Sequence, residues 1–162
     1  MGKLFFVLFL LIPGSAIAYN SEEFINRTVE YEIKSDNTHI NHYAVSQEKL
    51  DIYRNAHPHY NFPKKIKNLN RKQAEQILNY FWDNYRFSDY KYDEIQEKIW
   101  DMMIHMPMTE LENKINDCIR KYYKFDNDFY TPFGSVASVS LLNSMAPKNI
   151  PNFYLILNEI QY

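Results

Sequence analysis

Apolar side chains recur at helical spacing along most of this chain. Residues 21–32 place them on one side at steps of three and four, with Ser21 available as the N-terminal cap. Residues 46–55 repeat the pattern in a shorter form, with Leu50 and Tyr53 facing inward. Both segments therefore predict amphipathic helices, joined by a polar loop.

The strongest helical pattern covers residues 70–87. Asn70 is a good cap, and Gln73 stands three positions later, where a capping box needs it. The same reasoning predicts four more helices, over residues 93–106, from Thr109 with Glu112 as its capping box, over 136–145 after Ser135, and over 152–161. No useful strand alternation is present, and only 3 glycines argue against many hairpins. We therefore expect a mostly α protein, a compact helical bundle with a small C-terminal helical pair.

The first 18 residues differ from the rest. Lys3 precedes an uninterrupted apolar run, and Ala16-Ile17-Ala18 has the small-x-small pattern of a cleavage site. This predicts a secretory signal peptide cleaved after Ala18, and hence an exported, periplasmic or extracellular protein. An uncleaved N-terminal anchor is the alternative, although the run is short for a membrane span.

Charge and cysteine content limit which kinds of partner and site this protein can have. The net charge of -2 lacks the basic excess of a protein that follows nucleic-acid phosphates, so we expect no nucleic-acid partner. Cys118 is the single cysteine and lies on the apolar face of a predicted helix, so we expect a buried thiol and no intramolecular disulfide. The four histidines His39, His42, His57 and His59 raise the alternative of a metal site. The prolines around His57 and the lack of an HExxH motif argue against it, so we predict no metal and no cofactor.

An ordered series of short motifs carries a resemblance to a known family. The chain has Glu32 at a helix end, and then Asn41-His42-Tyr43-Ala44-Val45-Ser46, Leu69 to Ala74, Tyr80-Phe81-Trp82, Trp100-Asp101-Met102-Met103-Ile104-His105, and a tail from Asp128 to Asn143. This order and spacing resembles the N-acetylmuramidases of glycoside hydrolase family 108. The likeness implies a lysozyme-like helical domain over 19–124 and a peptidoglycan-binding helical subdomain over 125–162.

The resemblance also implies an activity and a set of site residues. The expected reaction is cleavage of the β-1,4 bond between N-acetylmuramic acid and N-acetylglucosamine, by a monomer acting on peptidoglycan strands. Such chemistry needs a carboxylic acid held protonated near neutral pH and often a second carboxylate. The resemblance gives Glu32 as the general acid, with Asp36 as the nearest second carboxylate. The residues expected to contact or frame the substrate are Tyr43, Ser46, Asp101 and His105, with Asp101 favoured in a structural role.

Two alternatives stay open. Ile33-Lys34 stands where the family has Gly-Gly, and Lys34 would favour the ionised form of Glu32. A catalytically inactive relative that binds peptidoglycan or a protein partner fits those departures. A toxin-type effector or secretion accessory would use the same chemistry in a different biological setting. Glu30 is the fallback for the acid.

Overall fold

The computed structural model describes residues 21–34 and 41–145, and these are mostly helical, as the sequence predicted. The signal peptide, Asp36, His39 and the predicted helix over 152–161 lie outside these residues. The described elements, in chain order, are α1 (Ser21–Lys34), β1 (Asn41–His42), β2 (Val45–Ser46), α2 (Gln47–Ala56), η1 (Ile66–Asn68), α3 (Arg71–Asn84), η2 (Phe87–Asp89), α4 (Asp93–His105) and α5 (Met108–Tyr123), and residues 136–145 are also helical.

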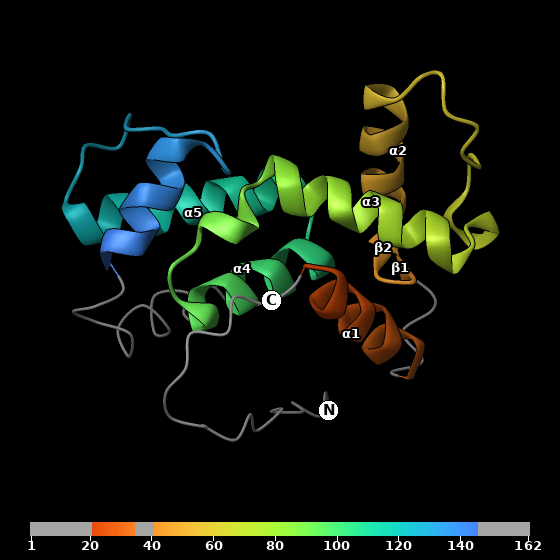
Figure 1. Ribbon diagram of the computed structural model, residues 1–162. Coiled ribbons are helices and arrows are strands. Elements are labelled where there is room, and N and C mark those ends of the chain that lie inside the picture. The colour runs from red at the N-terminus through yellow and green to blue at the C-terminus, as the bar shows by residue number, and fades with distance from the viewer. Residues whose placement is uncertain (1–20, 35–40, 146–162) are drawn as a thin grey trace, which may run out of the picture.

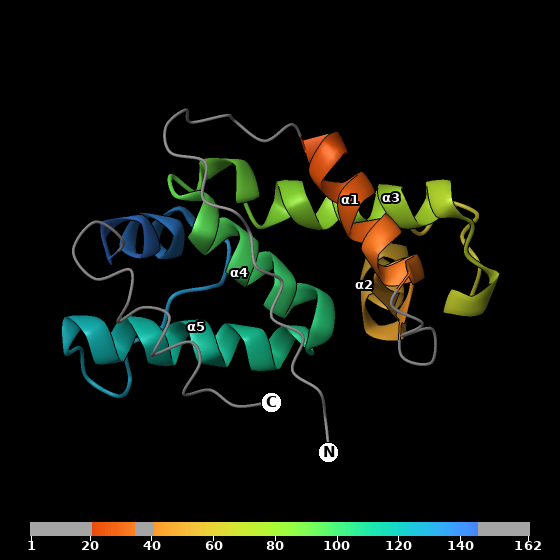
Figure 2. The same ribbon diagram turned by 90° about the horizontal axis from the view of Figure 1, so that it is seen from below.

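Two helices span the middle of the molecule. Figure 1 shows α2 and the β1–β2 pair at one end and α5 with residues 136–145 at the other, with α3 and α4 between them. α1 packs against α3, so the end of α1 lies beside the small β pair. Figure 2, seen from below, shows α4 passing between α1 and α5. The ends of α1 and α4 also meet, since the side chains of Glu32 on α1 and His105 on α4 lie 3.6 Å apart.

An aromatic cluster joins three of the helices. Phe24 of α1 contacts Trp82 of α3, and Trp100 of α4 meets Trp82 edge-on with ring centroids 5.2 Å apart. Phe87 packs against both tryptophans. The indole N–H of Trp100 donates to the hydroxyl of Thr28, 3.1 Å away, so burial of that tryptophan leaves no polar atom unsatisfied. The apolar stripes predicted for these helices all face this core.

The predicted start of α3 is confirmed, and its predicted end is wrong. Asn70 and Gln73 form the expected capping box, with each side chain bonded to the other residue's backbone N–H. The helix stops at Asn84, because Arg86 adopts a left-handed conformation with φ of 56°. Phe87 then turns into the core as part of η2. The apolar stripe is therefore continued by a new element.

The predicted capping box of α5 is also wrong. The helix begins at Met108, one residue before Thr109, and no side chain of its own turn caps it. Glu48 of α2 does so instead, since both carboxylate oxygens lie 3.2 Å from the backbone N of Met108. Glu112 faces the other way and accepts hydrogen bonds from the Tyr130 hydroxyl and from the backbone N–H of Phe133.

The β1–β2 hairpin was not predicted. Asn41 pairs with Ser46 and His42 with Val45, which leaves a two-residue turn. Both turn residues have positive φ, 53° at Tyr43 and 66° at Ala44, as type I′ hairpin turns require. The sequence did not indicate this turn, because neither residue is Gly, Asn or Asp, the residues that usually mark such turns. Ala44 and Val45 are fully buried, so core packing holds the turn in place.

Residues 125–145 pack onto α5 and the core. The side-chain amide of the buried Asn116 bonds both the carbonyl and the N–H of Thr131, at 3.0 and 2.8 Å. Gly134 has φ of +76°, and a Cβ there would come within 2.7 Å of the Tyr85 Cα. This glycine therefore allows the chain to pass closely over the end of α3. The predicted cap of the next helix is confirmed, since Ser135 accepts the backbone N–H of Ser138.

Candidate functional site

Glu32 occupies a buried position near the end of α1. It continues the face formed by the buried Ile25 and Val29, and its side chain is only 5% exposed. Glu30, two residues earlier, is turned away and pairs with Arg71 at the surface. The helical phase inferred from the sequence is therefore correct, and Glu32 differs from an ordinary solvated charge at a helix end.

The end of α4 brings two partners to Glu32. Asp101 and His105 lie one helical turn apart on the same side of α4. The Nε2 atom of His105 is 3.6 Å from Oε1 of Glu32 and 3.4 Å from Oδ1 of Asp101. One imidazole nitrogen therefore lies between two carboxylates from different helices. Asp101 is half exposed, so the group extends from the buried Glu32 towards solvent.

Burial and these neighbours shift the ionisation of the group. Burial raises the pKa of Glu32, the nearby His105 opposes that rise, and Asp101 adds to it. The pKa of His105 is raised, first through its hydrogen bond with Asp101 and also by the charge of Glu32, against the effect of its own burial. Both Glu32 and His105 therefore hold a proton to a higher pH than the same side chains would in water.

Lys49 is a member of this region that the sequence analysis missed. It is 1% exposed, and its Nζ lies 3.4 Å from both the Ser46 hydroxyl and the Met106 carbonyl. Burial lowers the pKa of its ammonium to about 8, although the Glu48 charge acts in the opposite direction. Its position four residues before the inward-facing Tyr53 was a signal that it shares the buried face of α2.

The hairpin adds the remaining predicted residues. Ser46 is partly exposed and caps α2. It lies close to Lys49, and the charge of Lys49 lowers the pKa of His105. Ser46 is therefore connected through Lys49 to the group formed by Glu32, Asp101 and His105. The buried Asn41, which pairs with Ser46 in the hairpin, extends its amide towards the Ile104 carbonyl at 3.4 Å. Tyr43 is partly buried at the turn, with its ring against that of His42. The structure therefore joins Glu32, Asp101, His105 and Ser46, whereas Asp36 lies outside the described residues.

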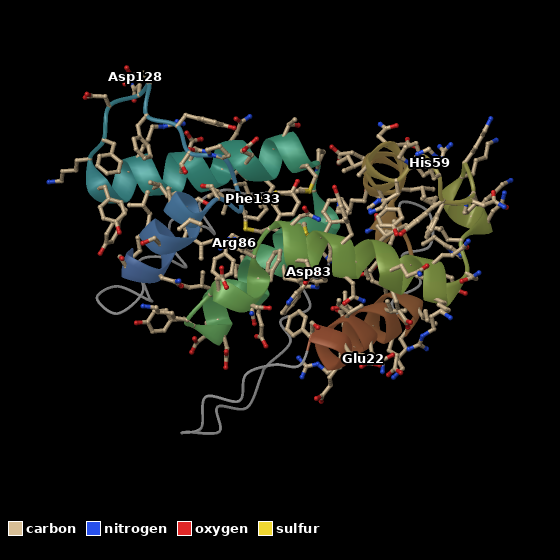
Figure 3. The ribbon with its side chains drawn as sticks, turned by 45° about the horizontal axis from the view of Figure 1, so that its top comes forward. Glu22, His59, Asp83, Arg86, Asp128 and Phe133 are labelled. Atoms are coloured by element: carbon tan, nitrogen blue, oxygen red, sulfur yellow. The ribbon has the colours of Figure 1, made fainter. Side chains whose placement is uncertain are left out.

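The histidines considered as metal ligands have other surroundings. The ring of His57 stacks between Tyr53 and Tyr60, with centroids 4.2 and 5.1 Å away. His59 lies in the loop beyond α2, as Figure 3 shows. Within 21–34 and 41–145, no group of three or more His, Cys, Asp or Glu side chains is arranged to hold a metal ion. Cys118 is buried, as predicted, and burial raises the pKa of its thiol to about 12.

Comparison of the chain with protein-family models, with curated proteins and with solved structures gave no match. Among the described helices, none is both long enough and apolar enough to cross a membrane. The interpretation of the site therefore depends on its own chemistry.

Proposed function

We propose that this chain is an exported peptidoglycan hydrolase, an N-acetylmuramidase that uses Glu32 as its general acid. The single observation that carries the proposal is the buried carboxyl at the end of α1, whose pKa is raised by its burial. A glycosidic oxygen leaves only when it is protonated, so the enzyme needs an acid that keeps its proton near neutral pH. Burial of Glu32 shifts its pKa in that direction, as burial does for other glycosidase acids.

Asp101 and His105 have defined parts in this proposal. Protonated Glu32 gives its proton to the leaving oxygen, and His105 then stabilises the carboxylate that remains, from 3.6 Å away. Asp101 keeps the imidazole in place and is a half-exposed carboxylate that shares this imidazole with Glu32. Carboxyl groups about 5–9.5 Å apart serve retaining or inverting hydrolysis, and Asp101 and Asp36 are the two candidates for the second group.

The test is digestion of purified peptidoglycan, with the released fragments identified by mass. A muramidase yields fragments with reducing N-acetylmuramic acid ends, and Glu32→Gln removes at least about 99% of that release, since an amide cannot act as an acid. Glu30→Gln is the matched control, because Glu30 lies on the same helix but faces solvent. Equal activity of Glu32→Gln and the unmodified chain would assign the acid to another residue.

One observation favours a second function. The imidazole beside Glu32 stabilises its ionised form, which is unfavourable for a general acid. A catalytically inactive protein that binds peptidoglycan would tolerate this. Binding to intact sacculi without release of fragments, by both the unmodified chain and Glu32→Gln, would support that function and exclude the enzyme.

A further inference from the structure

Ser46 and Lys49 form a pair that takes no part in the proposed proton transfer from Glu32. They stand three positions apart at the start of α2, as Ser-Gln-Glu-Lys, and this spacing puts both side chains on one side of the first helical turn. Lys49 Nζ lies 3.4 Å from Ser46 Oγ. The serine is partly exposed and the lysine is fully buried. A reagent arriving from solvent would therefore meet the hydroxyl, with the amine behind it.

We propose that Ser46 is a nucleophile, activated by Lys49 as its general base, for acyl transfer from carboxylic esters. A serine hydroxyl is a weak nucleophile until a neighbouring base accepts its proton, and a lysine fills that role when its environment keeps the amine neutral. The setting of Lys49 favours the neutral form, because the amine is buried and its two hydrogen-bond partners, Ser46 Oγ and the Met106 carbonyl, carry no negative charge that would hold the proton on it. This inference is independent of the proposed glycosidase.

The start of α2 supplies the other element that acyl transfer needs. The first backbone N–H groups of an α-helix have no carbonyl partner within the helix and carry partial positive charge. At α2 these belong to Gln47 and Glu48, which follow Ser46 directly. An ester carbonyl attacked by Ser46 would place its developing oxyanion beside them, where such donors stabilise charge.

Each step balances. Lys49 Nζ takes the hydroxyl proton while Ser46 Oγ bonds to the ester carbonyl carbon, and the carbonyl electron pair moves to oxygen. When that oxyanion collapses, the carbon–alkoxy bond breaks and the ammonium of Lys49 returns its proton to the leaving alcohol. Water then attacks the acyl carbon and gives a proton to Lys49. When the second oxyanion collapses, the bond from carbon to Oγ breaks, the ammonium of Lys49 returns that proton to Ser46 Oγ, and the carboxylic acid is released.

The charged groups coupled to Lys49 are Glu48 and His105. Glu48, on the same helix, raises the pKa of the lysine, and burial lowers it to about 8. The charge of Lys49 in turn lowers the pKa of His105 on α4. The neutral amine therefore accumulates as the pH rises through about 8, and the reactivity of Ser46 should rise with it.

The test uses the full chain with two probes, a fluorophosphonate that labels activated serines and p-nitrophenyl acetate as the ester. Phosphonylation replaces the P–F bond with an Oγ–P bond and releases fluoride, and mass spectrometry of peptides locates the label. We expect labelling at Ser46, none in Ser46→Ala, and a loss of at least about 100-fold in rate in Lys49→Met. Hydrolysis of the ester should fall in parallel.

Ser135 provides a matched control. It also caps a helix and accepts the backbone N–H three residues on, but that position is Ser138 and not a lysine. Ser135 should stay unlabelled, and Ser135→Ala should react as the unmodified chain does. A folded chain whose Ser46 stays unlabelled at about pH 9 overturns the proposal, as does full labelling in Lys49→Met. If Lys49→Met does not fold, the unmodified chain decides: labelling that is flat between about pH 6 and pH 10 excludes lysine as the base.

Discussion

Nε2 of His105 lies 3.6 Å from Oε1 of Glu32, so the histidine from α4 adjusts the acidity of a carboxyl buried on α1. The effect of the imidazole opposes that of burial. Removing the imidazole while keeping a polar side chain should therefore raise the pKa of Glu32 further. We expect this in His105→Gln, measured by the ¹³C shift of the Glu32 carboxyl as a function of pH. An unchanged midpoint would mean that the two groups do not interact in solution.

The stability of the protein should depend on pH through the ionisation of His105. The pKa of His105 is raised in the folded protein, mainly by Asp101. Below the pKa of about 6.5 that the histidine has in the unfolded chain, the pairing of protonated His105 with Asp101 stabilises the fold fully. This stabilisation is lost as the pH rises through the higher pKa of the folded protein. Thermal unfolding across this range should show the decline in the unmodified chain and a smaller one in Asp101→Asn. Equal slopes in the two proteins would exclude Asp101 as the stabilising partner.

Gly134→Ala should destabilise the protein by about 2 kcal/mol or more. Its φ of +76° is unfavourable for alanine, and the new Cβ would lie 2.7 Å from the Tyr85 Cα, a backbone atom that cannot turn aside. Denaturant unfolding measures the loss. Val136→Ala, two residues away at an exposed position, is the control and should change stability by less than about 0.5 kcal/mol.

Ala44→Gly should increase stability, by up to about 1 kcal/mol. Glycine relieves the positive φ of 66° at the hairpin turn, and this gain exceeds the loss of one buried methyl group. Equilibrium unfolding in urea tests the sign. Destabilisation would show that packing of the Ala44 methyl outweighs backbone strain.

Cys118 should be inert towards thiol reagents in the native protein. Its side chain is buried and its thiol pKa is raised to about 12, so little thiolate forms near neutral pH. A colorimetric disulfide reagent should react with it only after denaturant unfolds the chain. Rapid native reaction would indicate local opening of α5.

The parts of the fold that were predicted correctly are those set by short-range patterns. The capping box at Asn70 and the phase that buries Glu32 both follow from residues within one or two turns of helix. The errors have long-range causes. The start of α5 is fixed by Glu48, sixty residues earlier, and the Tyr43–Ala44 turn is held by burial in the core.

The same division applies to the candidate site. The resemblance proposed Glu32, Asp101, His105 and Ser46 as site residues, and the structure brings these four into one region. The sequence analysis missed Lys49, because a lysine on a short helix is normally solvated. Its burial depends on Ser46 and on the Met106 carbonyl beyond α4, a neighbour that no local pattern reveals.

The aromatic cluster has a practical consequence for experiments on this protein. The chain has 2 tryptophans, Trp82 and Trp100, and they touch each other in the core. Intrinsic tryptophan emission therefore reports changes at the junction of α1, α3 and α4. It does not respond to local changes at the hairpin or along α5. A ligand that alters the emission must act through this junction. A titration without a change in emission says nothing about the hairpin. An environment-sensitive dye attached to the cysteine of a Tyr43→Cys variant would report on the hairpin instead.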